Sequence, residues 1–259
     1  MNELHYSHVD AFADRIHSGG PAAVVQLEAF LPDERLQAIA AEINLPATAF
    51  AIPAQADSNY ELIWFSPHME LGLCGHASLA AAHVLITGAQ IRFHARRAGP
   101  IVVDRDGDRY AMSLPARVPT PRPLPELAAA LGANPVATLW HGERYAVFVL
   151  ANEQEVLTLT PDFAALAAHG NIQLIVTAPG ASSDIVSRVF VPGGGKDEDP
   201  VTGSAHAVIV PYWAKRLGHT EFSARQASAR GARLHCRLAD DRVILGGSCV
   251  TVIEGRIRI

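Results

Sequence analysis

Cysteine is scarce in this chain of 259 residues, and long apolar runs are missing. The three cysteines, Cys74, Cys236 and Cys249, form no CxxC pair, so neither a disulfide framework nor a structural zinc site is expected. The expected compartment is a reducing cytoplasm. Since no apolar run approaches the ~20 residues of a membrane span, we expect no membrane partner.

Metal-binding motifs and basic stripes are missing too. The sequence holds no HExxH and no cluster of His, Cys and carboxylates with ligand spacing, so we expect no metal. The formal net charge is −5 and is spread without long runs, which disfavours a nucleic-acid partner. Apolar residues make up 49% and charged residues 18%, which is the balance of a globular chain.

Two short loops, residues 73–78 and 199–206, carry most of the candidate chemistry. Each contains a glycine and opens a helix, and those helices are predicted to end at Gly88 and Gly218. A helix N-terminus offers unpaired backbone N–H groups and a partial positive charge, which suits a carboxylate. Two such N-termini, from two similar halves, predict a clamp for one small anion.

The order of patterns along the chain predicts an α+β fold with two similar halves. The helices at 75–87 and 204–217 are largely apolar, and a helix that is apolar on all sides is buried. A hairpin pattern that turns at Asp106-Gly107 has a counterpart that turns at Asp240-Asp241, which indicates duplication.

Prolines cluster between the halves. They predict a linker at 115–125, which separates a domain at 1–115 from a domain at 126–259. A second option is that the last strand crosses back to the N-terminal half. The predicted architecture of each domain is a sheet wrapped around a central buried helix, with the two helix N-termini facing one cleft.

Several segments, taken in chain order, form a pattern that spans nearly the whole sequence. They are His8-Val9-Asp10-Ala11-Phe12, Gly20-Pro21-Ala22-Ala23-Val24, Phe65-Ser66-Pro67, Cys74-Gly75-His76-Ala77, Ser187-Arg188-Val189-Phe190, Asp199-Pro200-Val201-Thr202-Gly203-Ser204-Ala205-His206 and Gln226-Ala227-Ser228-Ala229-Arg230-Gly231. The pattern resembles the phenazine-biosynthesis isomerase-like family, which has the diaminopimelate-epimerase-like fold. The run that begins at Asp199 is the most specific part of the resemblance.

The resemblance implies two domains, each a sheet around one central helix, with an active site between them. It implies cofactor-independent isomerisation in a homodimer, in which a proton is relocated on a small carboxylate-bearing substrate. Three functional residues of the family carry over, namely His76, Asp199 and Ser204. The family's acid–base glutamate does not, because Ala47 stands at its position, and Gly20 stands where the family has an asparagine.

The candidate catalytic residues are His76, Asp199 and Cys74. A helix N-terminus favours a neutral imidazole at His76 and can lower the pKa of a thiol such as Cys74. Simpler interpretations remain, with Asp199 or Ser204 as a helix cap and Cys74 as a packed side chain. Ala47 is expected in a polar, wet cleft. The residues expected to bind substrate are Gly75, Thr202, Gly203, Ser204, Asp10, Gly20 and Ala47.

Three functions stay open at the level of the sequence. The first is the cofactor-independent isomerase that the resemblance implies. The second is a catalytically silent homologue that binds a metabolite or a protein, which Ala47 favours. The third is a dehydratase or epimerase that uses the single thiol of Cys74, because Thr202 occupies the place where a two-thiol racemase needs its second cysteine.

Overall fold

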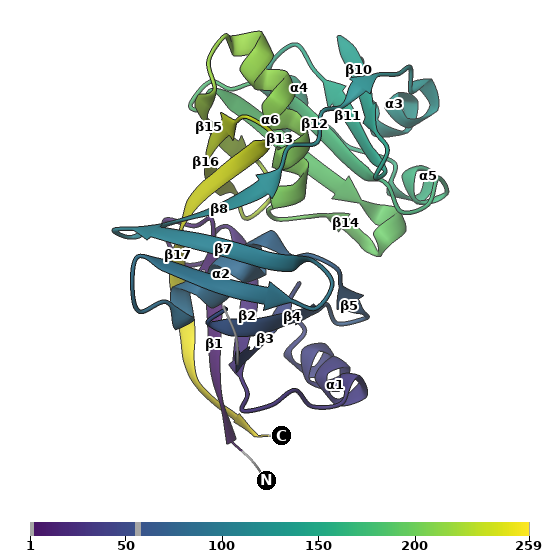
Figure 1. Cartoon of the computed structure of the whole chain (residues 1–259). Coiled ribbons are helices and arrows are strands. Elements are labelled where there is room, and N and C mark those ends of the chain that lie inside the picture. Colours follow the sequence, from purple (N-terminus) through teal and green to yellow (C-terminus); the bar gives the residue numbers. More distant parts are fainter. Residues whose placement is uncertain (1–2, 55–57, 259) are drawn as a thin grey trace. The chain divides into compact units, whose positions relative to one another are not determined.

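The computed structural model describes residues 3–54 and 58–258, and the chain divides into two compact units. Unit 1 comprises Met1–Ser113 and Gly246–Ile259, and unit 2 comprises Leu114–Leu245. Helices and strands occur in both units (Figure 1), which is the predicted α+β class. The last residues of the predicted second domain therefore belong to unit 1, where the two ends of the chain pair. The predicted domain ends at residues 1 and 259 lie outside the described residues.

Unit 1 surrounds one helix with strands. Its elements are β1 (Glu3–Ala11), β2 (Gly20–Gln26), α1 (Asp33–Ile43), β3 (Thr48–Pro53), β4 (Tyr60–Phe65), β5 (Glu70–Leu71), α2 (Gly75–Leu85), β6 (Gln90–Ala95), β7 (Gly99–Asp106) and β8 (Arg109–Pro115), with the end of β17 (Arg242–Arg258). Antiparallel pairs are β1–β2, β3–β4 and β6–β7, whereas β2–β3 and β4–β6 are parallel. Helix α2 packs against β1, β2 and β3, and β17 pairs with β1.

Unit 2 repeats this arrangement. Its elements are β9 (Thr120–Pro121), α3 (Pro125–Leu131), β10 (Ala137–His141), β11 (Tyr145–Val149), α4 (Glu153–Leu157), α5 (Phe163–Ala167), β12 (Gln173–Pro179), β13 (Ile185–Val191), η1 (Pro192–Gly194), β14 (Lys196–Glu198), α6 (Gly203–Leu217), β15 (Glu221–Gln226) and β16 (Ala232–Ala239). Antiparallel pairs are β10–β11, β12–β13 and β15–β16, whereas β11–β12 and β13–β15 are parallel. Helix α6 packs against β11 and β16.

The two units share one connectivity, which confirms the duplication expected from the sequence. In unit 1, α2 connects the sheet to β6, which pairs in parallel with β4. In unit 2, α6 connects the sheet to β15, which pairs in parallel with β13. The last matched positions are Leu62 with Ala95 in the first pair and Ser187 with Gln226 in the second. Equivalent positions of the two units can therefore be compared residue by residue.

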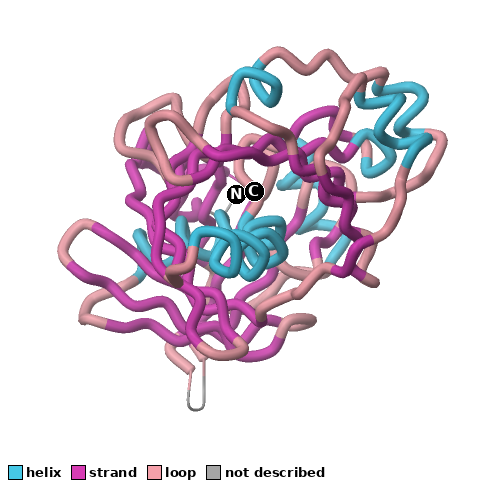
Figure 2. Tube along the Cα trace, turned by 90° about the horizontal axis from the view of Figure 1, so that it is seen from above, coloured by secondary structure: helices cyan, strands magenta, loops and turns pink. Residues whose placement is uncertain are grey.

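Helices α2 and α6 are buried along most of their length, as their composition predicts. Residues 76–82 of α2 and 205–210 of α6 are all buried. Figure 2 distinguishes the helices of the chain, in cyan, from its strands, in magenta. Burial on every side explains why neither helix needs a polar face. Among the helices of the described residues, none has the length and apolar character that crossing a membrane requires.

The ends of these two helices differ from each other. Gly218 follows α6 in the left-handed conformation, with φ of 79°, and its N–H donates to the Ala214 carbonyl as a glycine C-cap does. The predicted end of α2 at Gly88 is wrong. Helix α2 ends at Leu85, because Ile86 is already extended and leads the chain toward β6. A glycine near a helix end is thus not a sufficient signal when the next strand starts within a few residues.

The prediction of a linker at 115–125 is also wrong, because this segment belongs to unit 2 and contains β9 and the start of α3. Pro211 lies inside α6 and has no N–H to donate, so the carbonyl of Ala207 lacks its usual helical donor. The backbone N–H of Arg117 donates to that carbonyl at 3.0 Å. The proline-rich segment is therefore held against the central helix.

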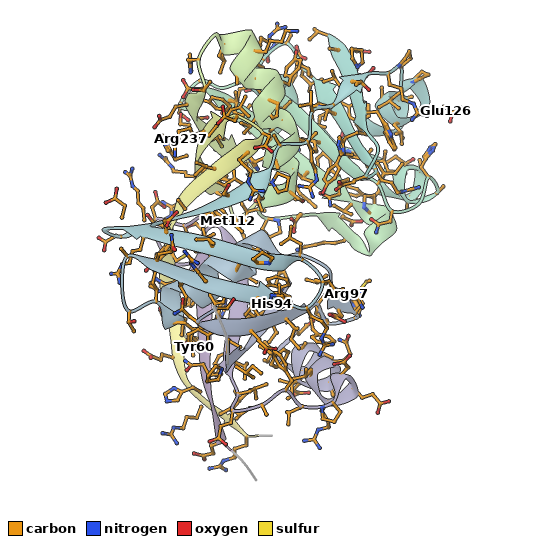
Figure 3. The ribbon with its side chains drawn as sticks, viewed as in Figure 1. Tyr60, His94, Arg97, Met112, Glu126 and Arg237 are labelled. Atoms are coloured by element: carbon orange, nitrogen blue, oxygen red, sulfur yellow. The ribbon has the colours of Figure 1, made fainter. Side chains whose placement is uncertain are left out.

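Alternation along the strands separates the core from the surface. On β6, Phe93 is buried and His94 is exposed, and on β16, Cys236 is buried and Arg237 is exposed. Burial raises the pKa of the Cys236 thiol far above its usual range, so this cysteine is inert packing. Figure 3 shows the labelled His94 and Arg237 side chains on their strands, with Met112 of β8 at a fully buried position.

We expect Gly19→Ala to destabilise unit 1 by at least about 2 kcal/mol. Gly19 has φ of +64°, and a Cβ there would lie 2.2 Å from the carbonyl oxygen of Ala11. Gly88→Ala is the matched control, because Gly88 has no positive φ and nothing lies within 4 Å of its Cβ position. Urea unfolding of the purified variants measures the difference. Equal midpoints for the two variants would contradict the strained turn.

Candidate functional site

One group of candidate functional residues lies at the start of α2 in unit 1. Cys74 is the N-cap residue, no side chain caps the helix there, and Gly75 is the first helical residue. The Cys74 Sγ lies 3.6 Å from Nδ1 and 3.8 Å from Nε2 of His76, and both side chains are buried. The Ser78 hydroxyl donates to the Cys74 carbonyl at 2.7 Å and fixes this turn. The predicted thiol and imidazole are therefore in contact, and such a pair can share a proton.

Asp10 and Gly20 lie on neighbouring strands of unit 1. Asp10 is fully buried on β1, and its Oδ2 accepts the backbone N–H of His17 at 2.8 Å. His17 has φ of 66°, a conformation that few residues other than glycine adopt. Gly20 begins β2 and pairs with Ala11 of β1. The Asp10 carboxylate thus orders the loop between these two strands.

Ala47 differs from its predicted surroundings. It precedes β3, it has no exposed surface, and its carbonyl accepts the N–H of Ala23 at 2.9 Å. The expectation of a polar, wet position is therefore wrong. The adjacent Thr48 hydroxyl is also buried, and within the described part of the chain it has no hydrogen-bond partner. A carboxylate introduced at position 47 would enter a packed region with little to solvate it.

Another group of candidate functional residues lies in the loop that precedes α6 in unit 2. The Lys196 Nζ donates to Asp199 Oδ1 at 2.9 Å, and the Thr202 hydroxyl donates to Asp199 Oδ2 at 2.5 Å. Asp199 keeps 18% of its side-chain surface exposed. Its backbone N–H donates to the Val189 carbonyl of β13 at 2.9 Å. Both oxygens of the predicted acid–base residue therefore accept hydrogen bonds from oriented donors while the group stays accessible.

Capping does not explain the polar residues at the start of α6. Thr202 occupies the N-cap position, but no side chain makes a capping hydrogen bond there, and Gly203 is the first helical residue. Asp199 lies before the cap. Ser204 lies inside the first turn, where its hydroxyl is 3.4 Å from Oε1 of Gln173. The capping interpretations of Asp199 and Ser204 are therefore wrong.

His206 is part of the packed interior of unit 2. Its Nδ1 lies 2.9 Å from the Thr202 carbonyl, so this nitrogen carries the hydrogen, and within the described residues Nε2 has no hydrogen-bond partner. Complete burial lowers the pKa of His206 to about 4, and the hydrogen bond to Thr202 offsets this slightly. The imidazole is therefore neutral near pH 7, and it stabilises the first turn of α6 by donating to the Thr202 carbonyl.

Two residues near Asp199 were not predicted, namely Lys196 and Gln226. Lys196 belongs to a short run of charged residues, a pattern that usually marks a solvated turn. Gln226 ends β15, and its carboxamide contacts the backbone of both Asp199 and Thr202. The available signal was its place in a segment of the family pattern. Buried positions alternate along β15, and at position 226 a polar glutamine stands where an apolar residue is expected.

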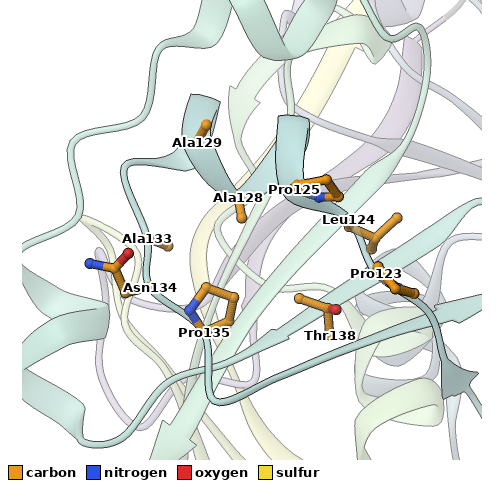
Figure 4. A pocket seen from close by; sticks show the side chains of 9 residues that line it. All are labelled: Pro123, Leu124, Pro125, Ala128, Ala129, Ala133, Asn134, Pro135 and Thr138. Atoms are coloured by element: carbon orange, nitrogen blue, oxygen red, sulfur yellow. The ribbon is translucent and has the colours of Figure 1, made fainter.

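Neither metal ligands nor a second polar site stand out in the described residues. No group of three or more His, Cys, Asp or Glu side chains there could hold a metal ion. A hollow of about 530 Å³ lies on unit 2 beside α3, between Leu124, Asn134 and Thr138 (Figure 4). None of the residues that line it carries an acidic or basic side chain, so it offers no group for proton transfer.

Comparisons with known proteins agree with the motif pattern. A family model described as phenazine biosynthesis-like protein matches residues 9–255. An uncharacterised isomerase of Pseudomonas aeruginosa is 44% identical over 263 residues, with 99% of each chain covered. A crystal structure of a PhzF-family phenazine biosynthesis protein from Enterococcus faecalis has a TM-score of 0.94 and 42% identity, with 100% of both chains covered. A hydroxyproline epimerase from Agrobacterium vitis, 9% identical with a TM-score of 0.64 over 98% of this chain and 92% of its own, shares the fold alone.

We expect the folded protein to lose stability between pH 6.5 and 4 because the buried His206 must then take up a proton. The unfolded chain binds a proton near pH 6.5, whereas the folded chain binds it only near 4, so stability falls as the pH drops through this window. The full difference amounts to about 3 kcal/mol. His206→Asn keeps a donor toward Thr202 and should lose less stability on acidification. His94→Asn, at an exposed position, is the control and should follow the wild type. Urea midpoints from pH 7 to 4.5 give the comparison, and identical slopes for all three proteins would contradict it.

We expect Ala47→Glu to destabilise the protein by several kcal/mol, because it places a carboxyl group where Ala47 has no exposed surface. The destabilisation should be smaller at pH 5 than at pH 8, since the neutral acid costs less to bury. Ala47→Leu controls for volume alone and should show no such pH dependence. Thermal melts at the two pH values decide. A variant as stable as the wild type at pH 8 would show that position 47 is wet after all.

Proposed function

Because the chain belongs to the phenazine biosynthesis-like family, we propose that it is a cofactor-independent isomerase that relocates a proton on a small carboxylate-bearing substrate. Relatives that are 44% and 37% identical over nearly the full chain are named isomerases. The observation that carries the proposal is the Asp199 carboxylate, which Lys196 and Thr202 hold in one orientation beside the start of α6. The family resemblance also supports a homodimer in the cytoplasm as the working form.

The starts of α2 and α6 supply the groups that would bind a carboxylate. Each helix begins with a glycine, Gly75 or Gly203, and neither has a side-chain cap. The first backbone N–H groups of an uncapped helix favour an anion, and a glycine lets the anion approach the backbone closely. The Ser204 hydroxyl, in the first turn of α6, adds one more donor. This inventory supports a carboxylic acid as the substrate class.

Proton transfer is assigned to Asp199 and His76. A carboxylate that accepts two hydrogen bonds and remains accessible suits a general base, and an imidazole in contact with a thiol suits a group that passes a proton on. The family's glutamate has no counterpart, because a methyl group at Ala47 exchanges no proton. The reaction therefore has to proceed with the remaining acid–base groups.

A second candidate is a one-thiol dehydratase or epimerase. The contact of 3.6 Å between Cys74 Sγ and His76 Nδ1 favours it, because an imidazole can accept the thiol proton and leave a thiolate. Thr202 marks the equivalent N-cap position in unit 2 and holds a hydroxyl that donates to Asp199. Such a hydroxyl is a weak acid and base at neutral pH, so a symmetrical two-thiol reaction is not supported.

Proton exchange with solvent tests the isomerase without knowledge of the product. The protein is incubated in D₂O with a panel of small cyclic and amino carboxylic acids, trans-4-hydroxy-L-proline among them, and deuterium incorporation is followed by proton NMR. Incorporation at a carbon next to a carboxyl or ring double bond in one acid supports the proposal. A panel without any exchange, together with saturable binding of one acid, would favour the silent homologue.

We expect Asp199→Asn and His76→Ala each to reduce the exchange rate about 10²–10⁴-fold, because each removes a positioned proton acceptor or donor. Cys74→Ser should reduce it less than tenfold if the thiol serves only to orient His76. The exchange assay uses the panel acid that the wild type exchanges fastest, and circular dichroism confirms folding of each variant. Near-complete loss in Cys74→Ser, with Asp199→Asn almost unaffected, would replace the isomerase assignment with the one-thiol reaction.

A further inference from the structure

Gln226 is a fully buried glutamine that spans the loop between Asp199 and Thr202. It is the last residue of β15, and its relative exposure is 0%. Its Oε1 accepts the backbone N–H of Thr202 at 2.9 Å, and its Nε2 donates to the backbone carbonyl of Asp199 at 2.7 Å. One carboxamide therefore satisfies a backbone donor at one end of the loop and a backbone acceptor at the other. A buried side chain with both of its functions used in this way has a fixed orientation.

The orientation of Gln226 sets the direction of the hydrogen bond to Asp199. The Nε2 of Gln226 lies 3.3 Å from the Thr202 hydroxyl oxygen, and an amide nitrogen can only donate. The hydroxyl oxygen accepts that contact, and its own hydrogen points to Asp199 Oδ2, 2.5 Å away. A relay thus runs from the Gln226 amide through the Thr202 hydroxyl to the carboxylate.

The sheet anchors this relay. Gln226 pairs with Ser187 of β13 and with Ala232 of β16, so its backbone is held on both sides. One residue on, the N–H of Ala227 donates to the Ser187 carbonyl at 2.7 Å. The Ser228 hydroxyl donates to the Pro200 carbonyl at 2.9 Å, a second tie to the same loop. A site built on regular strands is held more exactly than one that depends on the loop alone.

Unit 1 provides an internal comparison for the role of Gln226. The position of unit 1 that corresponds to Gln226 is Ala95, which pairs with Leu62 at the end of β6 as Gln226 pairs with Ser187 at the end of β15. Alanine has no side-chain hydrogen-bonding group. The fold therefore does not need a carboxamide at this position, and the glutamine occurs in the unit that carries Asp199.

We infer that Gln226 is a positioning residue, which fixes the Asp199 carboxylate in its reactive orientation through the loop backbone and the Thr202 hydroxyl. The inference rests on the proposed proton relocation and adds the group that organises it. Gln226 touches neither substrate nor the reacting atoms, so its removal should change the rate of the chemical step and leave binding nearly intact. A small displacement of a catalytic group costs about 10²-fold in rate.

The test compares Gln226→Met, Gln226→Glu and Thr177→Val in the D₂O assay, with the panel acid that the wild type exchanges fastest. Gln226→Met keeps the volume and removes every hydrogen bond, and kcat should fall about 10–100-fold with KM changed less than threefold. Thr177→Val removes two buried hydrogen bonds in the same unit, to Trp213 and the Val186 carbonyl, and should lower Tm without changing kcat.

The pH profile of Gln226→Glu separates positioning from packing. An ionised carboxyl at this position can only accept, and it would face the Asp199 carbonyl and the Thr202 hydroxyl, which itself links to the Asp199 carboxylate and, through it, to Lys196. A protonated carboxyl donates to that carbonyl again and accepts from the Thr202 N–H. The kcat of Gln226→Glu relative to the wild type should therefore rise as the pH falls from 8 to 5.5, whereas the ratio for Gln226→Met should stay flat.

The outcomes distinguish this inference from the proposed function. An active wild type with unchanged kcat in Gln226→Met, or parallel pH profiles for both variants, would overturn the positioning role. A wild type that exchanges no acid of the panel would refute the proposed function instead. In that case amide hydrogen exchange at Thr202 decides the positioning question. The exchange rate of the Thr202 amide should be at least about tenfold faster in Gln226→Met. An unchanged rate would show that Gln226 does not hold the loop backbone.

Discussion

The structure depends on enclosing a helix that is apolar on all sides, once in each unit. Helices α2 and α6 have no polar face to give to water, so strands must cover them around most of their circumference. This constraint fixes the place and direction of both helices. Their N-termini are the points where buried backbone N–H groups become available, and the residues with acid–base chemistry occur there, Cys74 and His76 in one unit and Asp199 in the other. Burial of the helix therefore positions the candidate residues within each unit.

The same architecture carries different chemistry in the two units. At the start of α2 a thiol and an imidazole are in contact, whereas at the start of α6 a carboxylate is held by an ammonium group and a hydroxyl. The polar support also differs, because Gln226 in unit 2 corresponds to Ala95 in unit 1. Duplication thus preserved the sheet and the central helix, which packing requires, and left the residues at the helix starts free to diverge.

Much of this could be predicted from the sequence, because apolar periodicity and short motifs are local signals. The central helices, the duplicated hairpins and the roles of His76 and Asp199 as candidates all follow from contiguous residues. The wrong predictions concern positions whose structure depends on contacts with segments that are distant in the sequence. The segment at 115–125 has the composition of a linker, but Pro211 leaves a carbonyl that Arg117 satisfies. The tie from Gln226 to Asp199 spans 27 positions and needs the β13–β15 register, which no local pattern shows.

Under the proposal that Ala47 stands in place of the family's glutamate, fewer acid–base groups remain for the reaction. Ala47 is sealed in the interior, so neither its own side chain nor water at that position takes over proton transfer. Inversion by two thiols needs a second cysteine at the N-cap of α6, and that position holds Thr202, whose hydroxyl donates to Asp199. Relocation of a proton needs one base that returns what it removed, together with a group that stabilises the anionic intermediate. A carboxylate with fixed donors and an uncapped helix N-terminus meet these two needs, which is why we propose relocation rather than two-thiol inversion.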